Sequence, residues 1–261
     1  MISLSTVDLA IAASLVLLVA LLQWRMRLGN TQSILIAATR TVVQLLLLGL
    51  VLKYVFAASD LLWIAVMAAI MLLAAGREVM VRQKRRFIGS WGFLLGTSSM
   101  FVSAFSVTML ALLVIVQPEP WYLPQYSIPL LGMLLGNTMN GITLGLDNLT
   151  RNAWDRRAVI DGRLALGETW SSAISEIRRD SIRVGMIPII NAMSVAGLVS
   201  LPGMMTGQIL AGTPPIEAVK YQILIIFLIA AGTGLGTITA IVIGCRRLFD
   251  ERERLRLDRL R

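Results

Sequence analysis

Residues 151–183 read RNAWDRRAVIDGRLALGETWSSAISEIRRDSIR, and they form the longest polar segment of a chain that is otherwise close to continuous hydrocarbon. The segment holds seven arginines and five acidic residues. Long apolar runs precede and follow it. We therefore expect residues 1–261 to form one membrane domain, with residues 151–183 as its largest segment in water.

The composition places the chain in the membrane. Of the 261 residues, 56% are hydrophobic and 15% are charged, whereas soluble domains carry about 25% charged residues. The net charge of +9 could indicate nucleic-acid binding. The bases cluster between apolar runs, however, which is typical of membrane topology, so we expect no nucleic-acid partner.

Missing residue types exclude several kinds of chemistry. Cys245 is the single cysteine and histidine is absent, so a disulfide within the chain, a thiolate metal cluster and a histidine base are all excluded. The sequence contains no G-x-x-x-x-G-K-[ST] phosphate loop and no paired carboxylates on one apolar face. We expect no enzyme and no cofactor, and a metal site stays undefined.

Seven apolar runs predict seven transmembrane helices. A helix needs about 20 residues to cross the hydrocarbon core, where its backbone must satisfy its own hydrogen bonds. The first run lacks the basic start and cleavage site of a signal peptide, so we expect it to be retained. The predicted fold is therefore all-α and polytopic. The runs cover residues 7–22, 34–56, 61–75, 87–116, 127–149, 185–200 and 216–244, and the apolar residues 201–212 could form a re-entrant segment or a short outer helix.

The positions of the bases predict the orientation. The segments after the first, third and fifth runs, together with the tail from Arg246, hold 21 of the 24 lysines and arginines. The alternate connections hold none. By the positive-inside rule, the N-terminus lies outside, and the C-terminus and residues 151–183 lie in the cytoplasm of a multi-pass cell-membrane protein.

The polar segment is expected to fold into two short helices. The segment divides at Asp161-Gly162, and Gly167 is a position where a helix breaks or starts again. The apolar residues around it recur at helical spacing and are Leu164, Trp170, Ile174 and Ile177. Such a helix–turn–helix could be a knob for a cytosolic partner, or an amphipathic loop that rests on anionic lipid headgroups.

Polar residues inside the predicted spans are candidates for a cargo pathway. Arg40 and Gln44 share a helix face, so Arg40 could be a gate or could reach the cytoplasmic interface. The fifth run carries a polar stripe that could line a pathway for hard cations, or only hold helices together by hydrogen bonds. The stripe is Gly136, Asn140, Thr143 and Asp147, flanked by Asn137, and Asn191 and Ser194 of the sixth run could complete the lining. Gly232, Gly234 and Gly236 predict a close helix or subunit interface in the seventh run.

Several motifs resemble the FetB-type permease family of ABC transporters. They are Leu164-Ala165-Leu166-Gly167-Glu168-Thr169 followed by Arg179-Asp180-Ser181-Ile182-Arg183, the outer-loop run Leu201-Pro202-Gly203-Met204-Met205-Thr206-Gly207, Ala218-Val219-Lys220-Tyr221-Gln222 and Arg40-Thr41-Val42-Val43-Gln44-Leu45. The resemblance extends over nearly the whole chain. Glu168 departs from the alanine that usually follows the glycine.

The resemblance implies a permease subunit, a homodimer joined to a separate cytosolic ATPase that docks at Leu164–Thr169. It also implies export of a metal ion such as iron, although plant relatives suggest a nucleotide-sugar cargo. The residues themselves leave open an ATP-independent transporter or channel, and a membrane scaffold that binds a partner or lipid.

Overall fold

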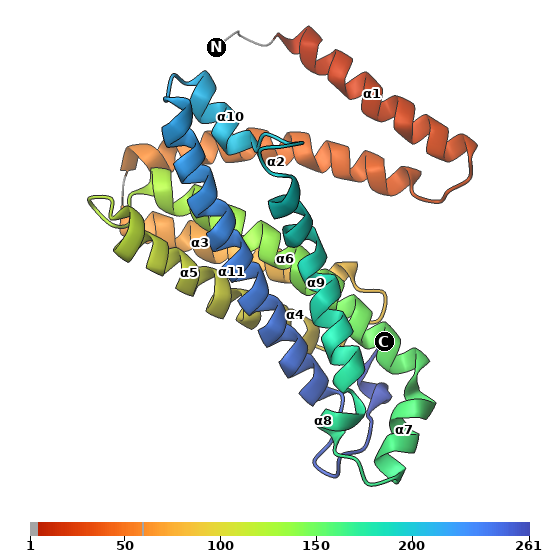
Figure 1. Cartoon of the computed structure of the whole chain (residues 1–261). Coiled ribbons are helices and arrows are strands. Elements are labelled where there is room, and N and C mark those ends of the chain that lie inside the picture. The colour runs from red at the N-terminus through yellow and green to blue at the C-terminus, as the bar shows by residue number, and fades with distance from the viewer. Residues whose placement is uncertain (1–4, 59) are drawn as a thin grey trace. The chain divides into compact units, whose positions relative to one another are not determined.

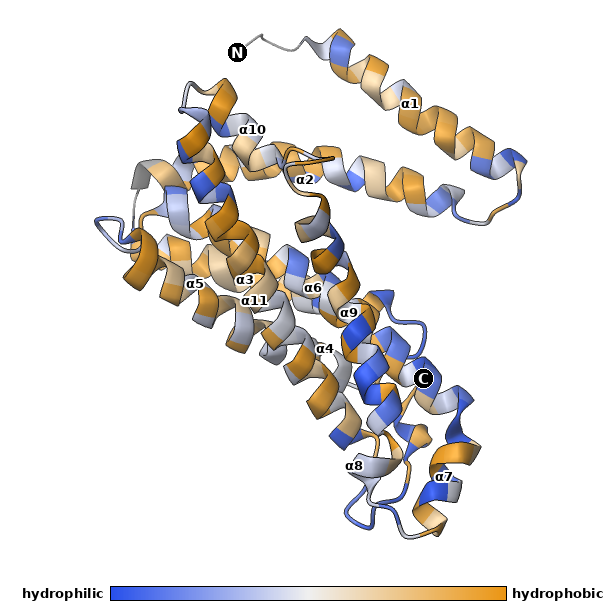
Figure 2. Ribbon diagram, viewed as in Figure 1, coloured by the Kyte–Doolittle hydropathy of each residue, from blue (hydrophilic) through white to orange (hydrophobic). Residues whose placement is uncertain are grey.

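The computed structural model describes residues 5–58 and 60–261. The described residues form helices and no named strand, which confirms the all-α class. The chain divides into two compact units, one up to Asp60 and one from Leu61 to Arg261. Within the described residues, five helices are long and apolar enough to cross a membrane, as a polytopic membrane protein requires. Figure 1 shows the helices, and Figure 2 shows that hydrophobic residues cover most of them.

The first unit is a pair of apolar helices, α1 (Thr6–Arg25) and α2 (Thr31–Ala58). A capping box starts α1: the Ser5 hydroxyl accepts the Asp8 backbone N–H at 3.2 Å, and the Asp8 carboxylate accepts the Ser5 N–H at 2.8 Å. The first two predicted runs lie within these helices. Arg40 and Gln44 both lie on α2 with exposed side chains.

The second unit is built around one long helix, α6 (Pro124–Asp155), which packs against α3, α9 and α11. The unit's fully buried apolar side chains include Leu134, Ile142 and Leu146 of α6. Its other helices are α3 (Leu61–Arg82), α4 (Trp91–Met100), α5 (Ser106–Leu110), α7 (Arg157–Ala165), α8 (Trp170–Ala173), α9 (Ser175–Val195), α10 (Gly203–Leu210) and α11 (Pro215–Arg247).

The fourth predicted run forms one continuous helical rod from Trp91 to Val116. Two π-helical turns, η1 (Phe101–Phe105) and η2 (Ala111–Val116), flank α5 within it. Each π-helical turn holds one more residue per hydrogen-bonded loop than an α-helix, which rotates the residues that follow. The buried side of the rod keeps small residues, Ala104 and Ala111, against the rest of the unit.

Glycines bring α6, α9 and α11 unusually close together. A Cβ added to Gly185 of α9 would lie 2.7 Å from the Gly141 carbonyl oxygen of α6. A Cβ added to Gly236 of α11 would lie 2.7 Å from Ser103 Oγ of η1. The glycine run of the seventh predicted span therefore forms a helix interface, and only glycine allows backbones this close.

Several helix ends differ from the predicted runs. The helix α3 continues past Arg77 to Arg82, because Val79 is fully buried in the unit's core and keeps the helix on the protein. The prediction that residues 151–183 divide at Asp161-Gly162 is wrong, since both residues lie inside α7 and the chain breaks at Arg156 instead. Residues 201–212 contain the short helix α10.

The fifth and sixth predicted runs correspond to α6 and α9, which are more polar than the five apolar helices. The 32 residues of α6 are long enough to cross a membrane. Several of the residues that lower its hydropathy, such as Thr138, Gly141 and Gly145, are buried against neighbouring helices. Blue and pale segments along α6 and α9 mark this polarity in Figure 2.

Candidate functional site

The basic segments of the second unit meet at one end of the helices. The loop of residues 83–90 and the helix α8 each contact the tail after α11 there, and α7 contacts α8. Arg86 and Arg261 exchange backbone N–H···O hydrogen bonds of 3.1 and 2.8 Å, and the Ile88 N–H donates to the Arg259 carbonyl at 2.9 Å. Figure 2 shows hydrophilic residues gathered around α7, α8 and the C-terminus. The basic segments of the second unit thus lie together at one end of it.

The turn between α7 and α8 presents a bare hydrophobic side chain. Gly167 adopts φ +89°, a left-handed conformation that favours glycine, and it reverses the chain after α7. Thr169 then caps α8, because its hydroxyl accepts the Ser172 backbone N–H at 3.4 Å. Leu166, at the tip, is 85% exposed. The short helix, glycine turn and second helix predicted from Gly167 are confirmed.

A small apolar core fixes this turn to the helices beneath it. Ile160 of α7 and Ile174 before α9 are buried, and Leu248 and Phe249 from the tail are buried in the same core. Leu164 packs partly against it. Leu166 therefore projects from a rigid base and not from a loose loop.

An ion pair ties α7 to α9 across the turn. A guanidinium nitrogen of Arg163 lies 3.0 Å from a carboxylate oxygen of Glu176. The hydrogen bond from Arg163 and its positive charge lower the pKa of Glu176 below its usual value. Because both side chains reach solvent, the pair orients α7 and contributes little to overall stability.

The tail after α11 holds α8 from the other side. The Glu253 carboxylate accepts the Trp170 backbone N–H at 3.0 Å, and the Trp170 ring lies 5.8 Å from the Phe249 ring. The Arg246 guanidinium lies 5.3 Å from the centre of the Trp170 ring. The sequence predicted only a basic tail, so this part of the site was missed.

Asp250 makes the tail compact. Its carboxylate accepts the backbone N–H groups of Arg252 and Arg254, both at 2.9 Å, and closes a tight loop. Asp and Asn are favoured where a side chain can close a turn on its own backbone. Glu253 within this loop has φ +59°, a conformation that is rare outside glycine and that aims its carboxylate at α8. Because aspartate favours such turns, Asp250 could have indicated an ordered loop from the sequence.

Asp147 of the predicted pathway lies beneath the basic loop. Its Oδ1 accepts the Lys84 backbone N–H at 2.9 Å. Thr150, one turn later, donates to the Arg85 carbonyl at 2.8 Å, and the Arg85 guanidinium stacks 4.0 Å from the centre of the Trp154 ring. Asp147 thus anchors the loop of residues 83–90 to α6.

The amide residues of the predicted pathway lie on exposed faces of α6 and α9. Asn137 and Asn140 are exposed on α6, and Asn191 and Ser194 are exposed on α9. The Asn137 amide donates to the Met133 carbonyl at 2.8 Å. Thr143 is buried and donates to the Met139 carbonyl at 2.7 Å, so it contributes to helix packing. The second unit thus brings the exposed residues to the surfaces of two packed helices, and Arg40 and Gln44 belong to the first unit.

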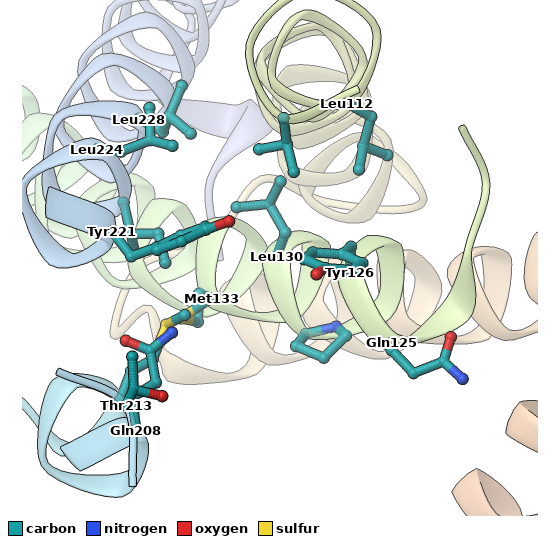
Figure 3. A pocket seen from close by; sticks show the side chains of 14 residues that line it. Leu112, Gln125, Tyr126, Leu130, Met133, Gln208, Thr213, Tyr221, Leu224 and Leu228 are labelled. Atoms are coloured by element: carbon teal, nitrogen blue, oxygen red, sulfur yellow. The ribbon is translucent and has the colours of Figure 1, made fainter. Parts of the chain in front are cut away.

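A cavity of about 310 Å³ lies between η2, α6, α10 and α11. Its walls are mainly apolar, and the side chains of Tyr126, Tyr221 and Gln208 also line it, as Figure 3 shows. Met204 of the outer-loop signature faces the same cavity, while its neighbour Met205 is buried. Leu201 is exposed, and Pro202, Gly203 and Gly207 lie at the start of and within α10. In residues 5–58 and 60–261, no group of three or more His, Cys, Asp or Glu residues is arranged to hold a metal ion.

The chain matches known membrane proteins over most of its length. Residues 6–249 match a family described as "Uncharacterised protein family (UPF0014)". A UPF0014 membrane protein of Synechocystis sp. is 41% identical over 91% of this chain and 90% of its own. The "Probable iron export permease protein FetB" of Escherichia coli is 32% identical over 97% and 96%. The Arabidopsis thaliana "Protein ALUMINUM SENSITIVE 3" is 29% identical over 88% and 82%. No solved structure matches the chain.

Proposed function

Because the chain belongs to the UPF0014 membrane-protein family and is similar to a protein named as a probable iron export permease, we propose that it is the permease subunit of an ABC transporter. In this proposal a separate cytosolic ATPase binds at Leu164–Thr169 and drives transport. The chain has no phosphate loop of its own, so ATP hydrolysis falls to the partner.

The exposure of Leu166 carries the proposal. A leucine that is 85% exposed is ordinary where a helix faces lipid. Leu166, however, lies at the tip of a polar turn, among charged residues. An isolated amphipathic loop on lipid would turn its apolar side chains together toward the membrane. Here Ile160 and Ile174 are buried under the turn while Leu166 points away from them. A protruding apolar side chain on a rigid base is the form of an anchor for a protein partner.

The helix α9 supports a mechanism for coupling. It begins at Ser175, one short helix (α8) after the docking turn of Leu164–Thr169, and runs to Val195 with Pro188 inside it. Ser181 donates to Asn148 Oδ1 of α6 at 3.1 Å, and Gly185 packs on Gly141 four residues further on. Closure of two ATPase subunits would press on the turn. Because α9 is continuous with the turn, this push would tilt α9 against α6.

The polar faces of α6 and α9 support a pathway between two copies of the chain. Exposed asparagines such as Asn140 and Asn191 are costly against lipid and belong against protein or water. We therefore place the cargo pathway at a homodimer interface, lined by the Asn137, Asn140, Asn191 and Ser194 side chains, with Arg40 and Gln44 of α2 as further candidates. Their amide and hydroxyl oxygens suit a hard metal ion, and the cargo is proposed to be one such as iron, moved outward.

A substitution at the docking turn tests the ATPase partner. Leu166→Asp should weaken binding of the proposed soluble ABC ATPase at least tenfold, because a buried apolar anchor is worth about 1.5–3 kcal/mol. Binding is measured with the permease in lipid nanodiscs. Leu198→Asp is the matched control, since Leu198 is 89% exposed between α9 and α10, near the end of the sixth predicted run that is expected to lie outside. Equal affinities of the two variants would refute the docking role.

Transport is tested with and without ATP. Liposomes that contain the permease and its ATPase should move a metal ion only when ATP is supplied on the ATPase side. A panel of metals and a nucleotide sugar identifies the cargo. Movement driven by an ion gradient in the absence of the ATPase would instead support a secondary transporter.

A further inference from the structure

The C-terminal tail and the docking turn enclose a groove. The groove measures about 670 Å³ and lies between α7, the Gly167 turn and the tail loop of residues 252–255. Leu164 and Leu255 line it, and Ala165 and Gly167 bring the exposed Leu166 to its rim. The most exposed apolar side chain of the turn therefore borders a concave surface that the tail completes.

The structure fixes the tail loop firmly in this position. The Asp250 carboxylate closes the loop on the backbone N–H groups of Arg252 and Arg254. Glu253 holds a left-handed φ of +59° and caps α8 at Trp170. A residue keeps such a conformation only where its surroundings hold it. A disordered extension of α11 would form neither the closed loop at Asp250 nor the hydrogen bond from Trp170 to Glu253.

The charges of the groove select a protein over a lipid surface. Its walls carry three carboxylates, Asp161, Glu168 and Glu253, and two arginines, Arg252 and Arg254. Anionic headgroups would be repelled by the three carboxylates. Glu168 accepts from the Ser172 hydroxyl at 2.8 Å, and Arg254 pairs with Asp250 at 2.9 Å. Among the residues that the structure describes, the Asp161 and Arg252 side chains form no ion pair, so opposite walls offer one acid and one base to a partner.

We propose that the tail loop of residues 250–255 is the second half of the ATPase-binding surface. The groove receives an apolar side chain of the ATPase beside Leu166, with a base of the ATPase toward Asp161 and an acid toward Arg252. This inference rests on the proposed function, and it adds a partner contact that lies about 85 residues further along the chain than the Gly167 turn. The permease then binds its ATPase through two segments. The turn of Leu164–Thr169 leads through α8 into α9, and the tail loop of residues 250–255 follows α11.

Charge reversal at Arg252 tests the inference. The variant Arg252→Glu should slow association of the purified soluble ATPase with the permease in nanodiscs, and weaken its affinity about tenfold, in 50 mM salt. The effect should shrink at 500 mM salt, because charges at an interface rim act mainly on association and are screened. A disturbed fold would instead weaken binding equally at both salt concentrations. Glu251→Lys is the matched control, since Glu251 lines the other side of the loop, toward Trp91.

The two proposals fail separately in this experiment. If Leu166→Asp weakens binding but Arg252→Glu binds like Glu251→Lys at both salt concentrations, the tail inference is wrong and the docking turn stands. If Leu166→Asp binds like the unaltered chain, the proposed function fails as well. A second charge reversal, Asp161→Lys, should also weaken binding of the ATPase at low salt. An unchanged affinity of this variant would contradict the arrangement of charges proposed for the groove.

Discussion

The contact between Gly185 and Gly141 gives the sharpest test of the helix packing that the coupling mechanism needs. In Gly185→Ala the added Cβ would lie 2.7 Å from the Gly141 carbonyl oxygen and 2.6 Å from Thr237 Cγ2. Carbon cannot approach backbone oxygen that closely, so α9 must move away from α6. Overpacking of this kind costs about 1–3 kcal/mol.

A second glycine on the same helix pair isolates the steric part. Alanine favours a helix over glycine by about 1 kcal/mol, which would partly offset the clash. Gly136→Ala gains the same preference, and its added Cβ would meet nothing within 4 Å. The difference between the two variants therefore measures the clash alone. It should be about 1–3 kcal/mol in favour of Gly136→Ala, which corresponds to roughly 2–10 °C in the midpoint of thermal unfolding.

The assay follows thermal unfolding of both variants in the same detergent and ATP-driven transport in liposomes. Gly185→Ala should unfold at the lower temperature and transport more slowly, because α9 would no longer follow the docking turn as one body with α6. Equal midpoints for Gly185→Ala and Gly136→Ala would refute the close contact. A lower midpoint with full transport would refute its place in coupling.

Two further predictions concern the tail and the pathway. Backbone hydrogen bonds, first from Arg254, lower the pKa of Asp250, so the stabilisation of the tail loop is complete above the ordinary aspartate pKa of about 4 and is lost as the pH falls through the lowered value. A fluorophore on Glu251→Cys should therefore become more mobile by anisotropy below about pH 4, whereas Asp250→Ala, which removes the acceptor of both backbone N–H groups, should give a mobile label already at pH 7. In the pathway, Asn140→Leu should reduce transport several-fold without lowering the thermal midpoint, because the exposed amide serves cargo and not packing; unchanged transport would remove Asn140 from the pathway.

The sequence predicted the membrane helices because the bilayer sets their length and the need for internal hydrogen bonds sets their type. It placed their ends less well. Composition suggested an end for α3 near Arg77, yet the helix continues because Val79, two residues later, finds a buried place. Whether a charged turn extends a helix depends on what packs beside it, and that neighbour is distant in the sequence.

The turn at Gly167 could be predicted from the sequence, whereas the contacts that the C-terminal tail makes with it could not. Gly167 lies among polar residues, where a glycine favours a break between helices, and its left-handed φ of +89° is a conformation that glycine adopts readily. The cap that Glu253 places on Trp170 joins residues 83 positions apart, and the bridge between Phe87 and Leu260 spans most of the chain. Both contacts depend on how α11 returns to the end of the unit where α7 and α8 lie, which no local pattern encodes. The sequence therefore predicted only a basic extension, although the tail forms one wall of the groove beside Leu166.

The return of α11 has a mechanical consequence. The docking turn is continuous with α9, and the tail loop is continuous with α11, so a partner that grips both acts on two helices at once. These helices meet again inside the unit, where Gly185 of α9 packs on Thr237 of α11 and on Gly141 of α6. A push on the turn alone would shear α9 past α11 at this contact, which the close packing of Gly185 against the Thr237 side chain resists. A push shared with the tail would move both helices together against α6. In the proposed transporter, a partner that holds both segments would therefore rotate α9 and α11 together against α6.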